Sequence, residues 1–152
     1  MKHSRSAERG ASAVEMAMVA PFLLLLLLGI IEFGYVFGQY NEVRHSAREG
    51  ARYAAVGNPD RTGDGNIDSA DVIDAVCDTL NLTGATVEIT TTISGSGEIG
   101  DEATLEVVLD IDSISGAPII SSFVPDELSN TATFRLEQDA EWSAFNTNDA
   151  CP

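Results

Sequence analysis

The sequence predicts an α+β fold in which a long N-terminal helix, first transmembrane and then amphipathic, packs against a small three-stranded antiparallel sheet. Three observations support it: an uncharged apolar run near the N-terminus, an apolar stripe of helical spacing that continues it, and three later segments that alternate with period two. The chain has 152 residues, enough for one small domain with its own core. We expect one helix over about residues 14–56, followed by an acidic α+β domain over residues 57–152.

The apolar run has the composition of a membrane-spanning helix. Residues 16–31 carry no charge, and as a helix they span about 24 Å, less than the roughly 30 Å hydrocarbon core of a bilayer. A helix over residues 11–37 reaches the full thickness and places Glu15 and Glu32 near its two ends. A cleaved secretory signal is disfavoured because no small-x-small site follows the run. A plain single-span anchor fits the length but leaves Glu15 without a partner, although a carboxylate at membrane depth costs roughly 2.5–3.5 kcal/mol unless it is paired.

Residues 38–56 continue the helix as an amphipathic extension, which "VGNPD" ends. Apolar side chains recur at steps of three or four and form one stripe, made of Ile30, Phe33, Phe37, Tyr40, Val43, Ala47, Ala51 and Ala54. Most polar side chains, Gln39 among them, are expected off this stripe. Two interpretations stay open: the stripe packs on the chain's own domain, or part of it packs against other subunits. Both can hold at different levels of the helix.

The stretch "RGASAVEMAMVAPFLLLLLLGIIEFG", together with "ARYAA" further on, resembles the TadE-like pseudopilins (minor pilins) of tight-adherence (Flp) type IV pilus systems. The resemblance implies that residues 1–10 are a prepilin-type leader, which a prepilin peptidase removes by cutting between Gly10 and Ala11. It also implies that Glu15, then the fifth residue, pairs with the free N-terminal ammonium of its own or a neighbouring subunit. Met16 departs from the family, in which an aromatic residue often follows the glutamate.

The same resemblance implies a pilin-like fold and a part in the assembly of tight-adherence pili. The partners would be the prepilin peptidase, other pilus subunits and membrane lipid. The alternative is a membrane-anchored, extracytoplasmic, calcium-dependent binding module, whose helix is only an anchor. The chain is not expected to be an enzyme, because its sequence shows neither a recognisable Ser/His/Asp constellation nor a phosphate-binding glycine loop.

Charge is distributed unevenly along the chain. Residues 57–152 hold nineteen acidic residues against Arg61 and Arg135, so this domain repels phosphates and nucleic acid is excluded as a partner. Three basic residues precede the apolar run and three follow it, so the positive-inside rule gives no clear orientation. The acidic domain and its cysteines favour a single-pass protein of the cytoplasmic (inner) membrane with the C-terminal domain outside, either in the membrane or in a pilus.

The stretch "DRTGDGNIDSAD", residues 60–71, resembles an EF-hand or dockerin calcium loop. Oxygen-bearing side chains alternate along it, and Gly65 permits the sharp turn that such a loop needs. The candidate ligands are Asp60, Thr62, Asp64, Asn66, Asp68 and Asp71. The other interpretation is a plain turn into a helix over residues 70–82, with Ser69 as its cap and Asp71 in its first turn. Calcium is therefore a candidate cofactor, although the pilus role requires none.

Three segments of the C-terminal half alternate as half-buried strands do, over residues 86–94, 104–112 and 131–138. The first two are joined by a glycine-rich loop, which predicts a hairpin. Residues 119–124 are expected to fold back onto the sheet, because their apolar side chains need cover.

The two cysteines, Cys77 and Cys151, are expected to form one disulfide if the chain is exported. Cys77 lies on the apolar face of the helix that follows the acidic loop, and Cys151 is the penultimate residue. The bridge would tie the C-terminus, with Trp142 and Phe145, to the domain. Two free thiols are the alternative for a cytosolic protein.

Overall fold

The computed structural model describes residues 4–57, 68–80, 86–114, 116, 118–140, 142–147 and 151. The chain forms two compact units, one made of Met1–Tyr35 and Ser113–Val124 and the other of Val36–Asp112 and Pro125–Pro152. Helix α1, Ser4–Val56, contributes to both units, and Pro21 lies inside it without ending it. The predicted α+β class, with its long N-terminal helix, is therefore observed.

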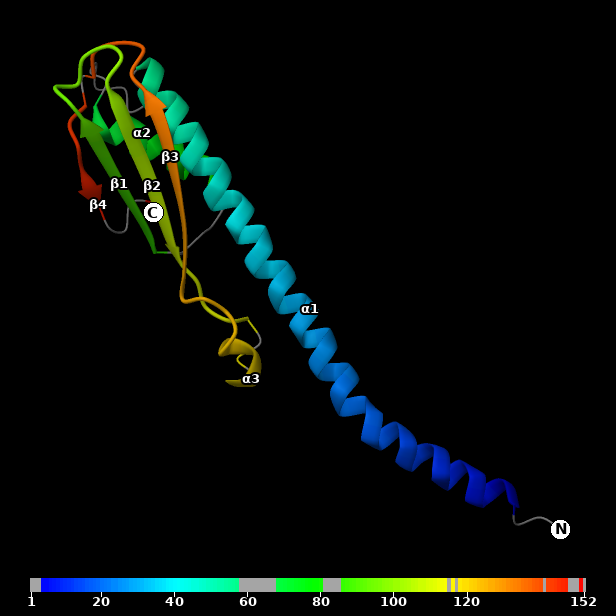
Figure 1. Cartoon of the computed structure of the whole chain (residues 1–152). Coiled ribbons are helices and arrows are strands. Elements are labelled where there is room, and N and C mark those ends of the chain that lie inside the picture. Colours follow the sequence, from blue (N-terminus) through cyan, green and yellow to red (C-terminus); the bar gives the residue numbers. More distant parts are fainter. Residues whose placement is uncertain are drawn as a thin grey trace. The chain divides into compact units, whose positions relative to one another are not determined.

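The second unit contains one antiparallel sheet (Figure 1). Its strands are β1 (Val87–Ser94), β2 (Glu102–Asp110), β3 (Glu127–Arg135) and β4 (Asn146–Thr147), in the order β3-β2-β1-β4. The prediction of three strands is wrong in number, because β4 pairs with β1 on the side away from β2. β4 is too short to show an alternating pattern. It is aligned by Thr91 N, which donates to Phe145 O over 2.8 Å, and by Phe145 N, which donates to Thr91 Oγ1 over 3.1 Å.

The alternation that predicted the longer strands also sets the inner face of the sheet. The buried side chains are Val87, Ile89 and Thr91 in β1 and Ala103, Leu105, Val107 and Leu109 in β2. β1 and β2 pair along the whole of β1 as the predicted hairpin. β3 begins at Glu127, earlier than the predicted residue 131, because its first residues pair with the end of β2. Leu128 is the one apolar residue in that added part, so alternation did not reveal it.

Within this unit, the C-terminal part of α1 packs through small side chains. Val43, Ala47, Ala51 and Ala54 are all buried, so this half of the predicted stripe faces the domain. Gly50 is also buried, and a Cβ atom there would collide with the side chain of Val76 and lie 3.2 Å from Leu105 Cδ1. The glycine therefore permits a close approach of α1 to α2 and β2, which a larger residue would prevent.

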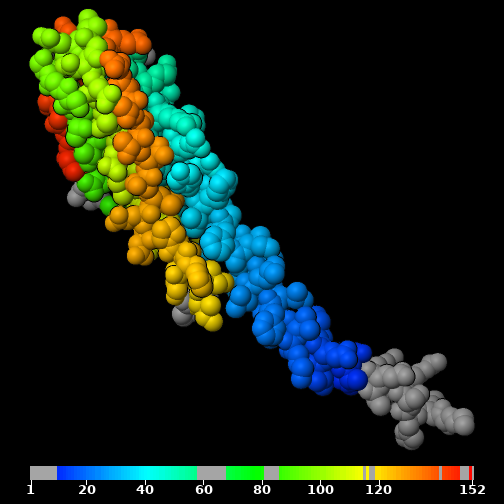
Figure 2. Space-filling view, viewed as in Figure 1, coloured from blue at the N-terminus to red at the C-terminus, as the bar shows by residue number. Residues whose placement is uncertain are grey.

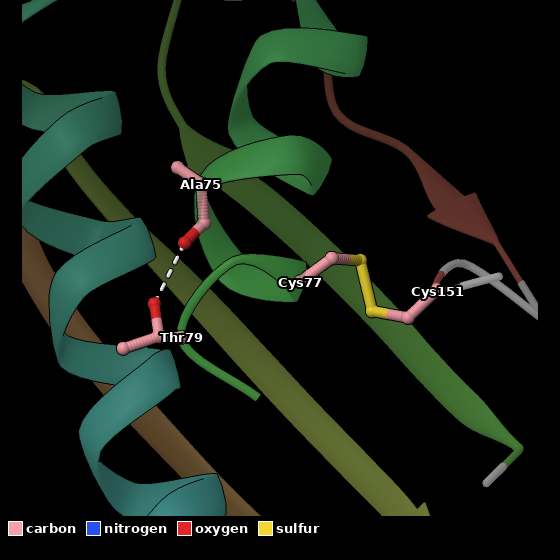
Figure 3. Close-up of a disulfide and its surroundings, with 4 residues drawn as sticks. All are labelled: Ala75, Cys77, Thr79 and Cys151. Carbon is pink, nitrogen blue, oxygen red and sulfur yellow. Dashed lines mark hydrogen bonds between the residues drawn. A yellow bond between two sulfur atoms is a disulfide. The ribbon is translucent and has the colours of Figure 1, made fainter. Parts of the chain in front are cut away.

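Helix α2, Ser69–Cys77, ends earlier than the predicted helix over residues 70–82. It presents Val76, which is fully buried, to the core. Beyond the helix the backbone tightens, because Thr79 N donates to Val76 O over 3.1 Å. The Thr79 hydroxyl also donates to the Ala75 carbonyl over 2.8 Å (Figure 3). A threonine that bonds back to the preceding turn competes with continued helix, which accounts for the early end.

The first unit combines the N-terminal part of α1 with the Ser113–Val124 segment, which contains the short helix α3, Pro118–Ser121. The prediction that residues 119–124 cover the sheet is wrong, since this segment groups with Met1–Tyr35. Of its apolar side chains, Ile120 is buried whereas Ile119 and Phe123 are exposed. Apolar character alone therefore did not decide where the segment packs.

Candidate functional site

The N-terminal part of α1 exposes its apolar side chains. Sixteen large hydrophobic residues from Val14 to Phe37 are exposed, by 41% at Leu28 and up to 76% at Phe22 (Figure 2, blue). The helix is long and apolar enough to cross a membrane, and no residue of its apolar window is buried. The core helix of a globular domain would bury such side chains. This part of α1 is therefore suited to anchor the chain in a membrane.

Gly10, Ala11 and Glu15, the predicted processing and pairing residues, lie on exposed turns of α1. Ala11 and Glu15 are four residues apart, so they share a helix face at a separation of about one pitch, ~5.4 Å. Side chains tilt toward the N-terminus of a helix, so the Glu15 side chain leans toward residue 11. This geometry suits a contact between the Glu15 carboxylate and an amino group at Ala11.

Glu32 lies in the apolar part of α1, and the sequence pattern predicted no contact for it. It has no exposed surface, although its neighbours Ile31 and Phe33 are exposed by 53% and 54%. Its Oε1 accepts a hydrogen bond from the backbone N–H of Ile114 over 2.9 Å. Burial of a carboxylate is costly unless it is hydrogen-bonded or paired. The sequence did contain a signal for the burial of Glu32, because a charged residue within an apolar run marks the side of the helix that faces protein.

A basic face lies on α1 beyond the apolar run. Its residues Asn41, Arg44, His45, Arg48, Glu49 and Arg52 line an open groove of about 480 Å³. The three arginines are spaced by four residues and therefore form one stripe. Glu49 Oε1 lies 2.5 Å from Arg52 Nη2, and this hydrogen bond and the charge of Glu49 raise the pKa of Arg52 above its ordinary value. The charge of this face is opposite to that of the acidic domain.

Of the six candidate calcium ligands, Asp60, Thr62, Asp64 and Asn66 lie outside the described residues. The other two form a capping box at the start of α2: Asp68 Oδ1 accepts from Ala70 N over 2.8 Å, and Asp71 Oδ2 accepts from Asp68 N over 3.0 Å. The cap is thus Asp68, and the expected cap Ser69 is instead the first helical residue. Over the described residues, no group of three or more His, Cys, Asp and Glu side chains is placed to hold a metal ion.

Calcium binding by the loop remains a prediction with a direct test. If the six oxygen ligands close around an ion in the folded state alone, the melting temperature rises with calcium concentration; a concentration of 100 Kd stabilises by about 2.7 kcal/mol. Asp64→Ala should abolish this rise, whereas Asp112→Ala, an exposed acid outside the loop, should leave it unchanged. Thermal melts of the full-length protein in detergent with calcium or magnesium provide the measurement. If the melting temperature of the wild-type protein does not change with millimolar calcium, the calcium prediction is wrong and the loop is a helix-capping turn.

The predicted disulfide is present (Figure 3). Cys77 and Cys151 are bonded, with Cα atoms 5.3 Å apart and a sequence separation of 74. The bond joins the end of α2 to the segment that follows β4. The same C-terminal part carries Trp142, which is 4% exposed and donates from Nε1 to the Ala54 carbonyl over 3.2 Å. The C-terminal part is therefore attached covalently at α2 and by packing at α1.

Residues 10–52 match the model of a family described as TadE-like protein. No curated protein and no solved structure matches the chain. The matched residues begin at Gly10 and contain Glu15, Glu32, the exposed apolar run and the basic face.

Proposed function

We propose that this chain, which is TadE-like over residues 10–52, is a minor pilin or pseudopilin that takes part in the assembly of tight-adherence pili. The observation that carries the proposal is the coincidence of the family match with the exposed apolar half of α1. The match begins at Gly10, one residue before the predicted mature N-terminus, and continues through the whole apolar run. A family match that covers the apolar helix together with the residues before and after it favours a specific role over a generic anchor.

The proposed maturation is a cut between Gly10 and Ala11 by a prepilin peptidase. The new ammonium group at Ala11 would then pair with the Glu15 carboxylate of its own or a neighbouring subunit. The position of both residues on one helix face supports the pairing within a subunit. We expect this ion pair, once it lies in lipid or between subunits, to set register more than to add stability. The subunit would sit in the cytoplasmic membrane with its acidic domain outside.

The proposed mechanism is assembly by packing, with no catalytic step. Two features of α1 support contacts with other subunits. Positions 29, 34 and 38 are glycines with open space where a side chain would lie, which permits close approach of another helix. The basic face offers an arginine stripe to an acidic partner, and the acidic domain of a second pilus subunit of this kind has the complementary charge.

Glu15→Gln tests this function. The amide keeps the shape of the side chain but cannot form the ion pair, so we expect membrane insertion to be intact and piliation to be lost or strongly reduced. An uncharged amide costs less in lipid than a carboxylate, so insertion should not fall. Membrane fractionation and electron microscopy of pili provide the two readouts.

The matched control is Glu8→Gln, which lies in the proposed leader and should leave piliation at the wild-type level. Normal piliation in the Glu15→Gln variant would contradict the pairing and would favour a simple anchor. Loss of insertion in the same variant would contradict the assumption that only assembly depends on this charge.

A further inference from the structure

One buried carboxylate and one uncharged segment meet in the first unit. Glu32 has no exposed surface, and its Oε1 accepts from the backbone N–H of Ile114 over 2.9 Å. A backbone N–H that bonds to a carboxylate offsets much of the cost of burying that group. Glu32 thus holds the Ser113–Val124 segment against α1; in Figure 2 the segment appears in yellow beside the blue helix.

The composition of this segment differs from that of the rest of the C-terminal half. Residues 113–125 carry no charge, while Asp112 and Asp126 stand at either end and residues 57–152 as a whole hold nineteen acids. Over the described residues, four large hydrophobic side chains outside α1 are exposed: Ile114 by 56%, Ile119 by 64%, Phe123 by 71% and Ile99 by 66%. Three of the four lie in this segment. Several exposed apolar side chains gathered in one uncharged segment are typical of a surface that contacts a membrane or another protein.

The hydrogen bond to Glu32 sets the level of the segment along α1. Residues 11–32 of an α-helix rise about 32 Å, and the hydrocarbon core is roughly 30 Å thick. A helix that enters the core at Ala11 therefore leaves it near Glu32. The Ile114 amide, bound to Glu32, then lies at the far boundary between hydrocarbon and headgroups.

We propose that the Ser113–Val124 segment is a second membrane contact, in which Ile119 and Phe123 insert beside α1 into the boundary between headgroups and acyl chains. The inference rests on the proposed membrane insertion of α1, and its partner is the lipid surface itself. Insertion desolvates no charge, and the neighbouring Ser121 and Ser122 suit the headgroup layer. Withdrawal of the subunit from the membrane would then require removal of these side chains from lipid as well as of the helix.

The test uses the full-length protein in vesicles of phosphatidylcholine and phosphatidylglycerol that contain nitroxide-labelled quencher lipids. Single cysteines are introduced by Phe123→Cys, Ile99→Cys or Ile30→Cys and labelled with an environment-sensitive fluorophore. The native disulfide is kept oxidised, so that only the new thiol reacts. Ile99 is the matched control, because it is an equally exposed apolar residue on the β1–β2 loop. Ile30 reports the span itself.

We expect the label at position 123 to lose most of its fluorescence to the quencher lipids, as the label at position 30 does, while the label at position 99 keeps its own. If position 30 is quenched and position 123 remains open to aqueous iodide, the second contact is wrong although the anchor holds. If position 30 is not quenched, the anchor itself is wrong. If position 123 is shielded from lipid and iodide alike, a protein partner covers the segment and the lipid proposal is overturned.

Two variants test the role of Glu32. Glu32→Gln keeps an oxygen that accepts from the Ile114 N–H, so the label at position 123 should remain quenched. Glu32→Ala removes the acceptor, and we expect quenching at position 123 to fall toward that at position 99 while position 30 is unchanged. Full quenching at position 123 in the alanine variant would show that Glu32 does not hold the segment at the membrane.

Discussion

Gly10→Leu should leave the precursor uncut in cells that have a working prepilin peptidase, whereas the wild-type chain should be recovered with Ala11 as its first residue. The proposed cut follows Gly10, and a bulky side chain there would obstruct access of the peptidase to the peptide bond. Apart from the adjoining residues and the nearby backbone of its own helix, no atom of the described residues lies within 4 Å of the position that a Cβ would take at Gly10, so the substitution fits the fold. The helix also gains, because glycine is less favourable in a helix than alanine by roughly 0.8–1 kcal/mol and leucine ranks next to alanine. Failure of cleavage would therefore report on the peptidase and not on misfolding.

The control for this prediction is a substitution at another glycine of α1. Gly29→Leu places the same side chain at another open helical glycine, and this variant should be cut normally. Gly10→Ala should be tolerated at least in part, because the added methyl group is small. Mass spectrometry of the intact chain distinguishes the precursor from the product, which is lighter by the mass of residues 1–10. Recovery of the full-length wild-type chain alone would reject the proposed maturation.

Cys151→Ser should cause the largest loss of stability among the changes considered. In the chain-entropy model, a bridge that closes a loop with a separation of 74 residues stabilises the fold by about 4.5 kcal/mol. The total stability of a small domain is typically about 5–15 kcal/mol, so this loss is a large fraction of it. The effect should be greatest for the C-terminal part, because β4 has two residues and depends on a covalent tie nearby.

Denaturant unfolding of the full-length protein in detergent, with and without reductant, measures this loss. Cys77→Ser and the double variant should match Cys151→Ser, since any of them removes the same bond, and reductant should lower the wild type to the same level. Ser143→Ala, an exposed change in the C-terminal part, should leave stability within the usual surface range of about 0.5 kcal/mol. Two free thiols in wild-type protein isolated without reductant would contradict the bond itself.

The sequence by itself determined the class of the fold, the long helix and the three longer strands. Period-two alternation marks a strand because one face of the sheet is buried, and Leu105, Val107 and Leu109 are buried as their spacing predicts. The pairing of Cys77 with Cys151 also followed, because the chain offers no other cysteine. The sequence did not predict β4, because a two-residue strand is too short to show an alternating pattern. Its position is set by hydrogen bonds to β1.

The acidic loop before α2 is a part of the chain whose role the sequence could not decide. The spacing of acidic residues suggested ligands, but Asp68 and Asp71 form the capping box of α2. The same two carboxylates suit a cap and a metal loop, because both use side-chain oxygens near the start of a helix. Residue types and spacing alone therefore could not separate the two interpretations.

Tertiary structure alone decided which face of α1 is covered. The apolar stripe was correct from Val43 onward, where burial against the domain follows hydrophobicity. Toward the N-terminus burial no longer follows hydrophobicity. The apolar Ile30, Phe33 and Phe37 are exposed, while the polar Glu32 and Gln39 are buried. The physical reason is a change of surroundings along one helix. Apolar side chains suit lipid as well as a protein core, so in a helix that is long and apolar enough to cross a membrane a charged residue such as Glu32 is the one that requires protein around it. Only the fold shows which segment supplies that cover.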